Sequence, residues 1–165
     1  MTQPKPTTWP QRLLDLAQTV STWSKSPSTG VGAVIADSRN RIVGIGYNGL
    51  PHGVTDSSER LKNREVKLAL TLHAEENAVL NSTKSVDGCS IYVTKPPCSH
   101  CASIIIQVGI TNVYYYRPPS EFETRWAESI RLANSVFDEA RVQVHILERT
   151  FSNATHHNIR VRTSS

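Results

Sequence analysis

Four residues in one short region have the side chains of a metal-dependent hydrolytic site. His73 and Glu75 stand two positions apart, and Cys98 and Cys101 follow in the motif C-x-x-C. Zinc binds imidazole nitrogen and thiolate sulfur, and a catalytic zinc keeps one of its four positions open for water. We therefore expect His73, Cys98 and Cys101 to be ligands, and Glu75 to reach the open side of the ion without binding it.

Simpler explanations compete with this prediction. A C-x-x-C pair before a helix also fits a thioredoxin-type redox pair, and H-x-E alone carries little information. A zinc ion that only fastens two helices needs the same three ligands but no poised carboxylate. The joint occurrence of both motifs, with Pro97 before the first cysteine and an apolar strand between them, favours catalysis, because H-x-E…P-C-x-x-C is typical of zinc-dependent nucleobase deaminases.

Two neighbours of these motifs carry side chains that could be mistaken for part of the site. His100, between the two cysteines, is a further possible ligand, although His73 already supplies an imidazole. Glu76, beside the proposed catalytic carboxylate, is expected to point outward and form a surface pair.

The elements that must position these residues follow from hydrophobic periodicity and turn signals. Helices are predicted over 12–24 after a break at Pro10, from the later half of 51–70 through His73 to about Asn81, over 98–109 and over 120–140. Strands are predicted over 30–37, 41–49, 88–94, 112–117 and 142–148. The last three strands are separated by helices, which favours parallel neighbours with helices on both faces.

We therefore expect an α/β fold, a three-layer α/β/α sandwich around a five-stranded mixed sheet. The 165 residues suit one domain over 1–150, with 151–165 as a tail that is mobile or lies at a subunit interface. Neither a membrane span nor a secretory signal is recognisable, so the cytosol is the expected compartment. Three cysteines do not make a disulfide framework.

The charge distribution argues against a polyanionic partner. The net charge is +4, but five of the 18 basic residues lie before residue 13 or after residue 148, where there is no acidic residue. The body of the chain is therefore nearly neutral, and neither a nucleic-acid nor a membrane partner is expected.

Three stretches give the chain a more specific resemblance. "VGAVIADSRNRIVGIGYNGLPHG" at 31–53, "HAEENAV" at 73–79 and "GCSIYVTKPPCSHCASIIIQVGI" at 88–110 resemble the deoxycytidylate (dCMP) deaminase family, in order, from about Trp9 to Leu147. "GYNGLPHG" at 46–53 separates this family from relatives that act on free nucleosides or on RNA. The resemblance implies the cytidine deaminase-like form of the α/β/α sandwich.

The implied reaction is hydrolysis of dCMP to dUMP and ammonia, which feeds thymidylate synthesis. Water activated by Zn²⁺ would attack C4 of the cytosine, and Glu75 would carry protons to N3 and to the leaving amine. The family also implies a cytoplasmic homohexamer that dCTP with Mg²⁺ activates and dTTP inhibits. The alternative within this chemistry is another cytosine substrate, either dCTP or a base in nucleic acid.

The resemblance also implies residues that bind nucleotides. Asn48 would bind the sugar hydroxyl of the substrate, and Asn48, Gly49, Pro51 and Gly53 would form the loop that holds the effector. Gly-rich backbone can approach a phosphate closely, and an Asn amide offers both a donor and an acceptor.

The remaining substrate contacts are expected around the metal motifs and at the strand ends. Ala74 and Pro97, which adjoin the ligands, are expected in the substrate pocket. Lys25 is the first candidate for the phosphate, and Arg117, at a strand end, is the second. Tyr115 or Tyr116 could wall the base, and Tyr116 is our choice. Residues 55–70 contain neither cysteine nor histidine, so a second zinc is not expected.

Overall fold

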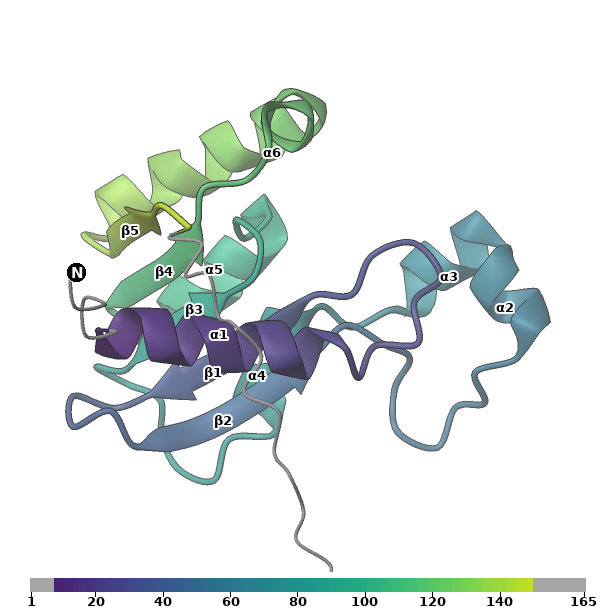
Figure 1. Ribbon diagram of the computed structural model, residues 1–165, viewed down its shortest axis with the longest axis horizontal. Helices are drawn as coiled ribbons and strands as arrows, with labels where there is room; N and C mark the ends of the chain where they lie inside the picture. Colours follow the sequence, from purple (N-terminus) through teal and green to yellow (C-terminus); the bar gives the residue numbers. More distant parts are fainter. Residues whose placement is uncertain (1–7, 150–165) are drawn as a thin grey trace, which may run out of the picture.

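A computed structural model describes residues 8–149, which form a mixed sheet between two layers of helices (Figure 1). The strands are β1 (Gly32–Ala36), β2 (Ile42–Tyr47), β3 (Ser90–Val93), β4 (Asn112–Tyr116) and β5 (Gln143–Leu147). Their order across the sheet is β2-β1-β3-β4-β5. β1 is antiparallel to β2 and β3, whereas β3, β4 and β5 are parallel. The predicted five-stranded mixed sheet is therefore confirmed.

The helices lie on both faces of this sheet. α1 (Trp9–Ser21) packs on one face through Leu13, Leu14 and Ala17. α4 (Ala74–Leu80), α5 (Ser99–Gln107) and α6 (Ser120–Glu139) enclose the larger core on the other face. The α/β/α sandwich is thus the observed fold, and no helix of the described residues is long and apolar enough to cross a membrane. The predicted tail, 151–165, lies outside the described residues.

Two short helices, α2 (Ser58–Lys62) and α3 (Arg64–Leu70), project beyond the end of the sheet in Figure 1. Neither helix has a buried residue. They belong to a projecting lobe, residues 50–71, whose base is closed by two backbone hydrogen bonds between Gly49 and Leu72, at 3.1 and 2.9 Å. Ion pairing of Lys25 with Asp56 joins the lobe to the loop after α1.

The predicted helix running through His73 is wrong. Asn63 and Thr71 have extended backbones, with ψ of 106° and 119°, so the segment divides into α2, α3 and α4. The Asn63 side chain caps α3, and Leu72 pairs with Gly49. Because the chain is extended at Leu72, His73 becomes the residue that caps the start of α4.

The first helix also starts earlier than predicted. Pro10 lies in its first turn, where the backbone N–H that proline lacks would have no helical partner, so the predicted break at Pro10 is wrong. The side chains of Thr8 and Gln11 complete the helix start. α1 ends at Ser21, which leaves Trp23 outside the helix and exposed.

Glycines in β2 set the position of α4. A Cβ on Gly46 would overlap the backbone of Ala74 and Ala78, and one on Gly44 would overlap the Ala78 carbonyl oxygen. The helix backbone therefore lies directly on the strand. This close approach fixes the start of α4, and with it His73, against the sheet.

Candidate metal centre

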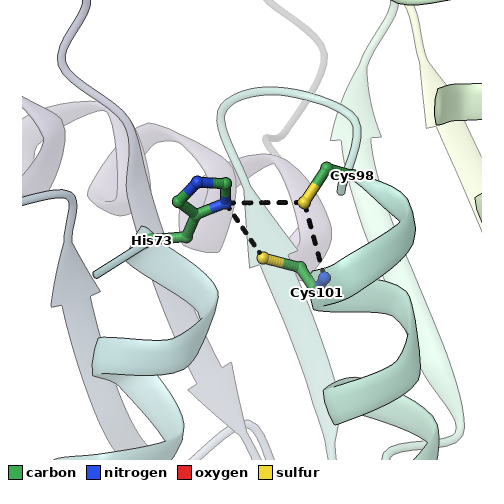
Figure 2. A group of neighbouring side chains, drawn as sticks. All are labelled: His73, Cys98 and Cys101. Atoms are coloured by element: carbon green, nitrogen blue, oxygen red, sulfur yellow. Dashed lines mark hydrogen bonds between the residues drawn. The ribbon is translucent and has the colours of Figure 1, made fainter. Parts of the chain in front are cut away.

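The three predicted ligands converge from two helix starts (Figure 2). His73 Nδ1 lies 3.3 Å from Cys101 Sγ and 3.5 Å from Cys98 Sγ. All three ligand atoms lie within 4.8 Å of one another, and within 8–149 this is the one group of three or more His, Cys, Asp or Glu side chains with such spacing. His100 is not part of it.

The group fits a zinc ion. Tetrahedral zinc with Zn–S of about 2.3 Å and Zn–N of about 2.0–2.1 Å places nitrogen and sulfur about 3.5 Å apart. The two observed nitrogen–sulfur distances match that value. One imidazole and two thiols also leave one tetrahedral position for water, as a catalytic site requires.

Local helix chemistry favours these ligands. Cys98 caps the start of α5, and its sulfur accepts a hydrogen bond from the Cys101 N–H at 3.4 Å. Pro97, which is buried, gives the extended backbone that precedes the helix. Free amides and the positive end of the helix dipole stabilise a thiolate at this position.

In the absence of metal, hydrogen bonds among the three predicted ligands shift their pKa values. A hydrogen bond from the Cys101 thiol lowers the pKa of Cys98 to about 3, although burial opposes it. The same hydrogen bond and burial raise the pKa of Cys101 above its usual range. Hydrogen bonding with Cys98 raises the pKa of His73 to about 9, also against burial. Zinc would thus replace protons on Cys101 and His73.

Glu75 is a buried acid beside these ligands. It is the second residue of α4, and only 4% of its surface is exposed. Burial raises the pKa of Glu75 to about 7, while the positive charge of His73 acts in the opposite direction. A carboxyl group with a pKa near neutrality can both accept and donate a proton at pH 7.

Glu76 makes more contacts than the predicted surface pair. Its Oε2 accepts a hydrogen bond from the His73 backbone N–H at 2.8 Å, and its Oε1 lies 3.2 Å from His100 Nε2. The first contact completes a capping box at the start of α4. Sequence reasoning missed this role because it placed His73 inside a longer helix.

Two predicted nucleotide contacts are held by protein partners. Asn48 Oδ1 accepts from the Val31 N–H at 2.7 Å, and Asn48 Nδ2 donates to the Thr29 carbonyl at 3.0 Å. The amide retains one further donor and one acceptor. Lys25, whose side chain is 72% exposed, lies 2.8 Å from Asp56.

Two more predicted contacts lie at the carboxyl end of β4. Arg117 pairs with Glu148 at 2.6 Å. Tyr116 packs on the α1 side of the sheet, and its hydroxyl donates to Asp15 at 3.3 Å. The ligands stand on helices of the other face, so the structure does not bring Tyr116 to the metal centre. Alternation along β4 instead places Tyr115 in the core on that face.

The small residues predicted to contact nucleotides lie in two places, beside the predicted ligands and at the projecting lobe. Ala74 and Pro97 are buried next to the ligands. Gly49 pairs with Leu72 at the base of the projecting lobe, and Pro51 and Gly53 follow within it. Gly53 has a φ of 81°, which favours glycine.

Lys95 is a cation that sequence reasoning overlooked. It lies in the loop between β3 and α5, and its Nζ stands 5.0 Å from the centre of the Phe122 ring. Burial lowers the pKa of Lys95.

Known proteins share this fold and these motifs. The family described as the cytidine and deoxycytidylate deaminase zinc-binding region matches residues 7–117. The uncharacterized deaminase in the luxG 3' region of Aliivibrio fischeri is 48% identical over 136 residues, covering 82% of this chain and 91% of that protein.

More distant relatives carry specific names. Human deoxycytidylate deaminase is 42% identical over 113 residues, which are 65% of this chain, so the chain spans 64% of the length of that relative. The crystal structure of dCMP deaminase from cyanophage S-TIM5 in apo form superposes with a TM-score of 0.66 at 25% identity, over 88% of this chain and all of that one. With the family match spanning more than half of the sequence, the chain belongs to the zinc-binding cytidine and deoxycytidylate deaminase family.

Proposed function

We propose that this protein is a zinc-dependent enzyme that hydrolyses dCMP to dUMP and ammonia. The observation that carries the proposal is the convergence of His73, Cys98 and Cys101 beside the buried Glu75. The names of the human and cyanophage relatives support dCMP as the substrate. A redox role for the two cysteines has less support, because it gives no use to His73 or Glu75.

The residues of the centre divide the work of the reaction. His73 Nδ1 and the sulfurs of Cys98 and Cys101 would hold the zinc ion, which, when bound, supplies a water activated for attack on C4 of the cytosine. Glu75 would accept a proton from that water. The same carboxyl would deliver this proton to ring N3, then take the remaining proton from the hydroxyl added at C4 and deliver it to the departing amine, so that water and cytosine become uracil and ammonia.

The substrate would lie against the start of both helices. Ala74 and Pro97 are buried beside the ligands and would contact the base. The free donor and acceptor of Asn48 would bind the sugar hydroxyl. Lys25 and Arg117 remain candidates for the phosphate, and each would have to exchange its present partner, Asp56 or Glu148, for the ligand.

Regulation and assembly are part of the proposal. We infer a cytoplasmic homohexamer, activated by dCTP with Mg²⁺ and inhibited by dTTP, in which Asn48, Gly49, Pro51 and Gly53 contact the effector. The apolar side chains exposed on α3, Val66, Leu68 and Leu70, are consistent with a subunit contact in the projecting lobe. The three cysteines are free, as in a reducing compartment.

Ammonia release from four substrates tests the proposal. The zinc-loaded protein would be given cytidine, dCMP, dCTP and a cytosine-containing single-stranded oligonucleotide, each with and without dCTP–Mg²⁺ and dTTP. We expect the fastest turnover with dCMP and loss of turnover after chelation of zinc. Equal rates with cytidine and dCMP would contradict a pocket that recognises the phosphate, and a preference for the oligonucleotide would support the nucleic-acid alternative.

A further inference from the structure

We propose that Glu76 and His100 form a clamp that holds the two halves of the zinc site at binding distance before the metal arrives. This inference rests on the proposed zinc site and adds positioning residues to it. Neither side chain belongs to the group of ligand atoms.

The first half of the clamp is the contact of Glu76 with the imidazole ligand. The Glu76 carboxylate accepts the His73 N–H through Oε2 at 2.8 Å. This bond fixes the backbone of His73 at the cap of α4, which limits the positions that the imidazole can reach. The Glu76 side chain is 17% exposed, although the bond itself lies at an exposed position.

The second half joins the same carboxylate to the other helix. Glu76 Oε1 lies 3.2 Å from Nε2 of His100, the residue directly before the ligand Cys101. One carboxylate therefore connects the backbone of the imidazole ligand to the turn that carries both thiols. Within 8–149, the side-chain hydrogen bonds between α4 with its cap and α5 with its cap involve either the ligand atoms themselves or this pair.

The two helix starts are otherwise anchored to different parts of the molecule. α4 lies on β2, and Asn77 Nδ2 donates to the Tyr47 carbonyl at 2.7 Å. α5 packs against α6, where the Ser99 N–H donates to Ser129 Oγ at 3.1 Å. The two helices share the larger core, and the clamp adds a direct polar link that keeps the nitrogen and sulfurs of the metal-free site together.

Such a link should act on metal retention more than on global stability. An exposed ion pair adds little to folding, and the His100 side chain is 70% exposed. Partners that orient metal ligands, by contrast, commonly change metal affinity by about 10- to 100-fold. Removing an ordinary surface pair would change neither metal retention nor global stability, so a measurement of both distinguishes the clamp from a surface pair.

The test measures zinc transfer from the loaded protein to a chromogenic chelator. We expect His100→Ala to release zinc about tenfold faster than the unmodified protein, and His100→Gln, whose amide can still donate to Glu76, to restore most of the retention. Ser103→Ala, a change at an exposed residue of the same helix, is the matched control. The melting temperature of metal-free His100→Ala should equal that of metal-free Ser103→Ala.

A second comparison tests whether the two residues act together. Glu76→Ala removes both halves of the clamp and should release zinc at least as fast as His100→Ala. Adding His100→Ala to Glu76→Ala should then have no further effect. Release from His100→Ala at the rate of Ser103→Ala would overturn the clamp alone. A protein that takes up no zinc before any substitution would overturn the proposed function as well.

Discussion

The candidate centre could be predicted at the residue level because few other kinds of site combine these residue types. An imidazole, two thiols and an acid in the order H-x-E…P-C-x-x-C are enough to predict the ligand set, and the three ligand atoms do converge. The sequence could not show the contacts that depend on tertiary structure. The ion pairs of Lys25 and Arg117, and the second bond of Glu76, join residues 31, 31 and 24 positions apart.

Replacing Glu75 with Gln separates metal binding from proton transfer. The amide has nearly the same size but cannot carry protons, so we expect turnover of dCMP to fall by at least about 100-fold while zinc content and fold are kept. Zinc analysis and ammonia release check this outcome. Glu128→Gln, on the surface of α6, should leave both unchanged, and full activity of Glu75→Gln would reject the proposed mechanism.

Replacing Cys98 with Ala should remove the metal. Two remaining ligands hold zinc much less tightly than three, so the zinc content should fall from about one ion per chain to near zero. Cys89→Ala is the control, because Cys89 is a free, buried cysteine that lies outside the ligand group. Retention of zinc by Cys98→Ala, measured by elemental analysis after dialysis, would exclude this sulfur as a ligand.

At the level of helices and strands, the sequence predicted type and order better than boundaries. The predicted helix runs from the later half of 51–70 through His73 to about Asn81, whereas the caps of α3 and α4 divide this segment. That division is essential to the site, since it moves His73 from a helix interior to a helix start. Pairing of Leu72 with Gly49 causes it, and a contact between segments so distant in the chain leaves no local pattern.

The close packing of α4 on β2 can be tested by a substitution at Gly46. A methyl group there would overlap the backbone of Ala74 and Ala78, so Gly46→Ala should displace the helix and destabilise the fold by about 1–3 kcal/mol. Chemical unfolding measures the loss. Gly49→Ala provides the comparison for stability, because a Cβ there meets only ordinary van der Waals contacts. Equal stability of the two variants would mean that α4 can shift without cost.

The β1–β2 turn gives the protein an acid-sensitive contact. Asp37 accepts hydrogen bonds from the Arg39 and Arg41 N–H groups, each at 3.0 Å, and pairs with Lys84 at 2.9 Å. Lys84 above all, and then these backbone groups, hold the pKa of Asp37 well below its usual range, although burial opposes them.

Asp37→Asn should therefore lower the melting temperature at neutral pH. Because the folded pKa lies below the unfolded one, the stabilisation is complete above about pH 5, and it decreases as the pH falls below about 4. Melting curves from pH 3 to pH 7 should show the difference between the two proteins shrinking toward acid. A constant difference would show that the charge of Asp37 contributes nothing.

For the whole molecule, the element order predicted the parallel pairing of the last three strands, because helices between strands favour parallel neighbours. The order could not predict the projecting lobe, whose helices α2 and α3 bury nothing within 8–149. A segment without buried residues has no core periodicity, so the sequence indicates a charged loop for the first half of 51–70 and only the start of a helix for the later half.

Leu68→Glu tests the lobe as a subunit contact. Leu68 is 55% exposed on α3, and a carboxylate in its place would be costly to bury between subunits. We expect the mass measured by light scattering to fall below that of the unmodified protein. Leu80→Glu, at the end of α4, should leave the mass unchanged. A monomeric unmodified protein would contradict the proposed hexamer directly.

The hydrogen bond between the start of α5 and Ser129 of α6 has a consequence for folding during translation. Cys101 completes the ligand set, yet the Ser129 hydroxyl that anchors the start of α5 is added 28 residues later. During translation, all three predicted zinc ligands are therefore added to the chain before the residue that anchors α5. A nascent protein in this state has every proposed donor atom and an incomplete scaffold, so we expect stable zinc binding only after α6 has been synthesised.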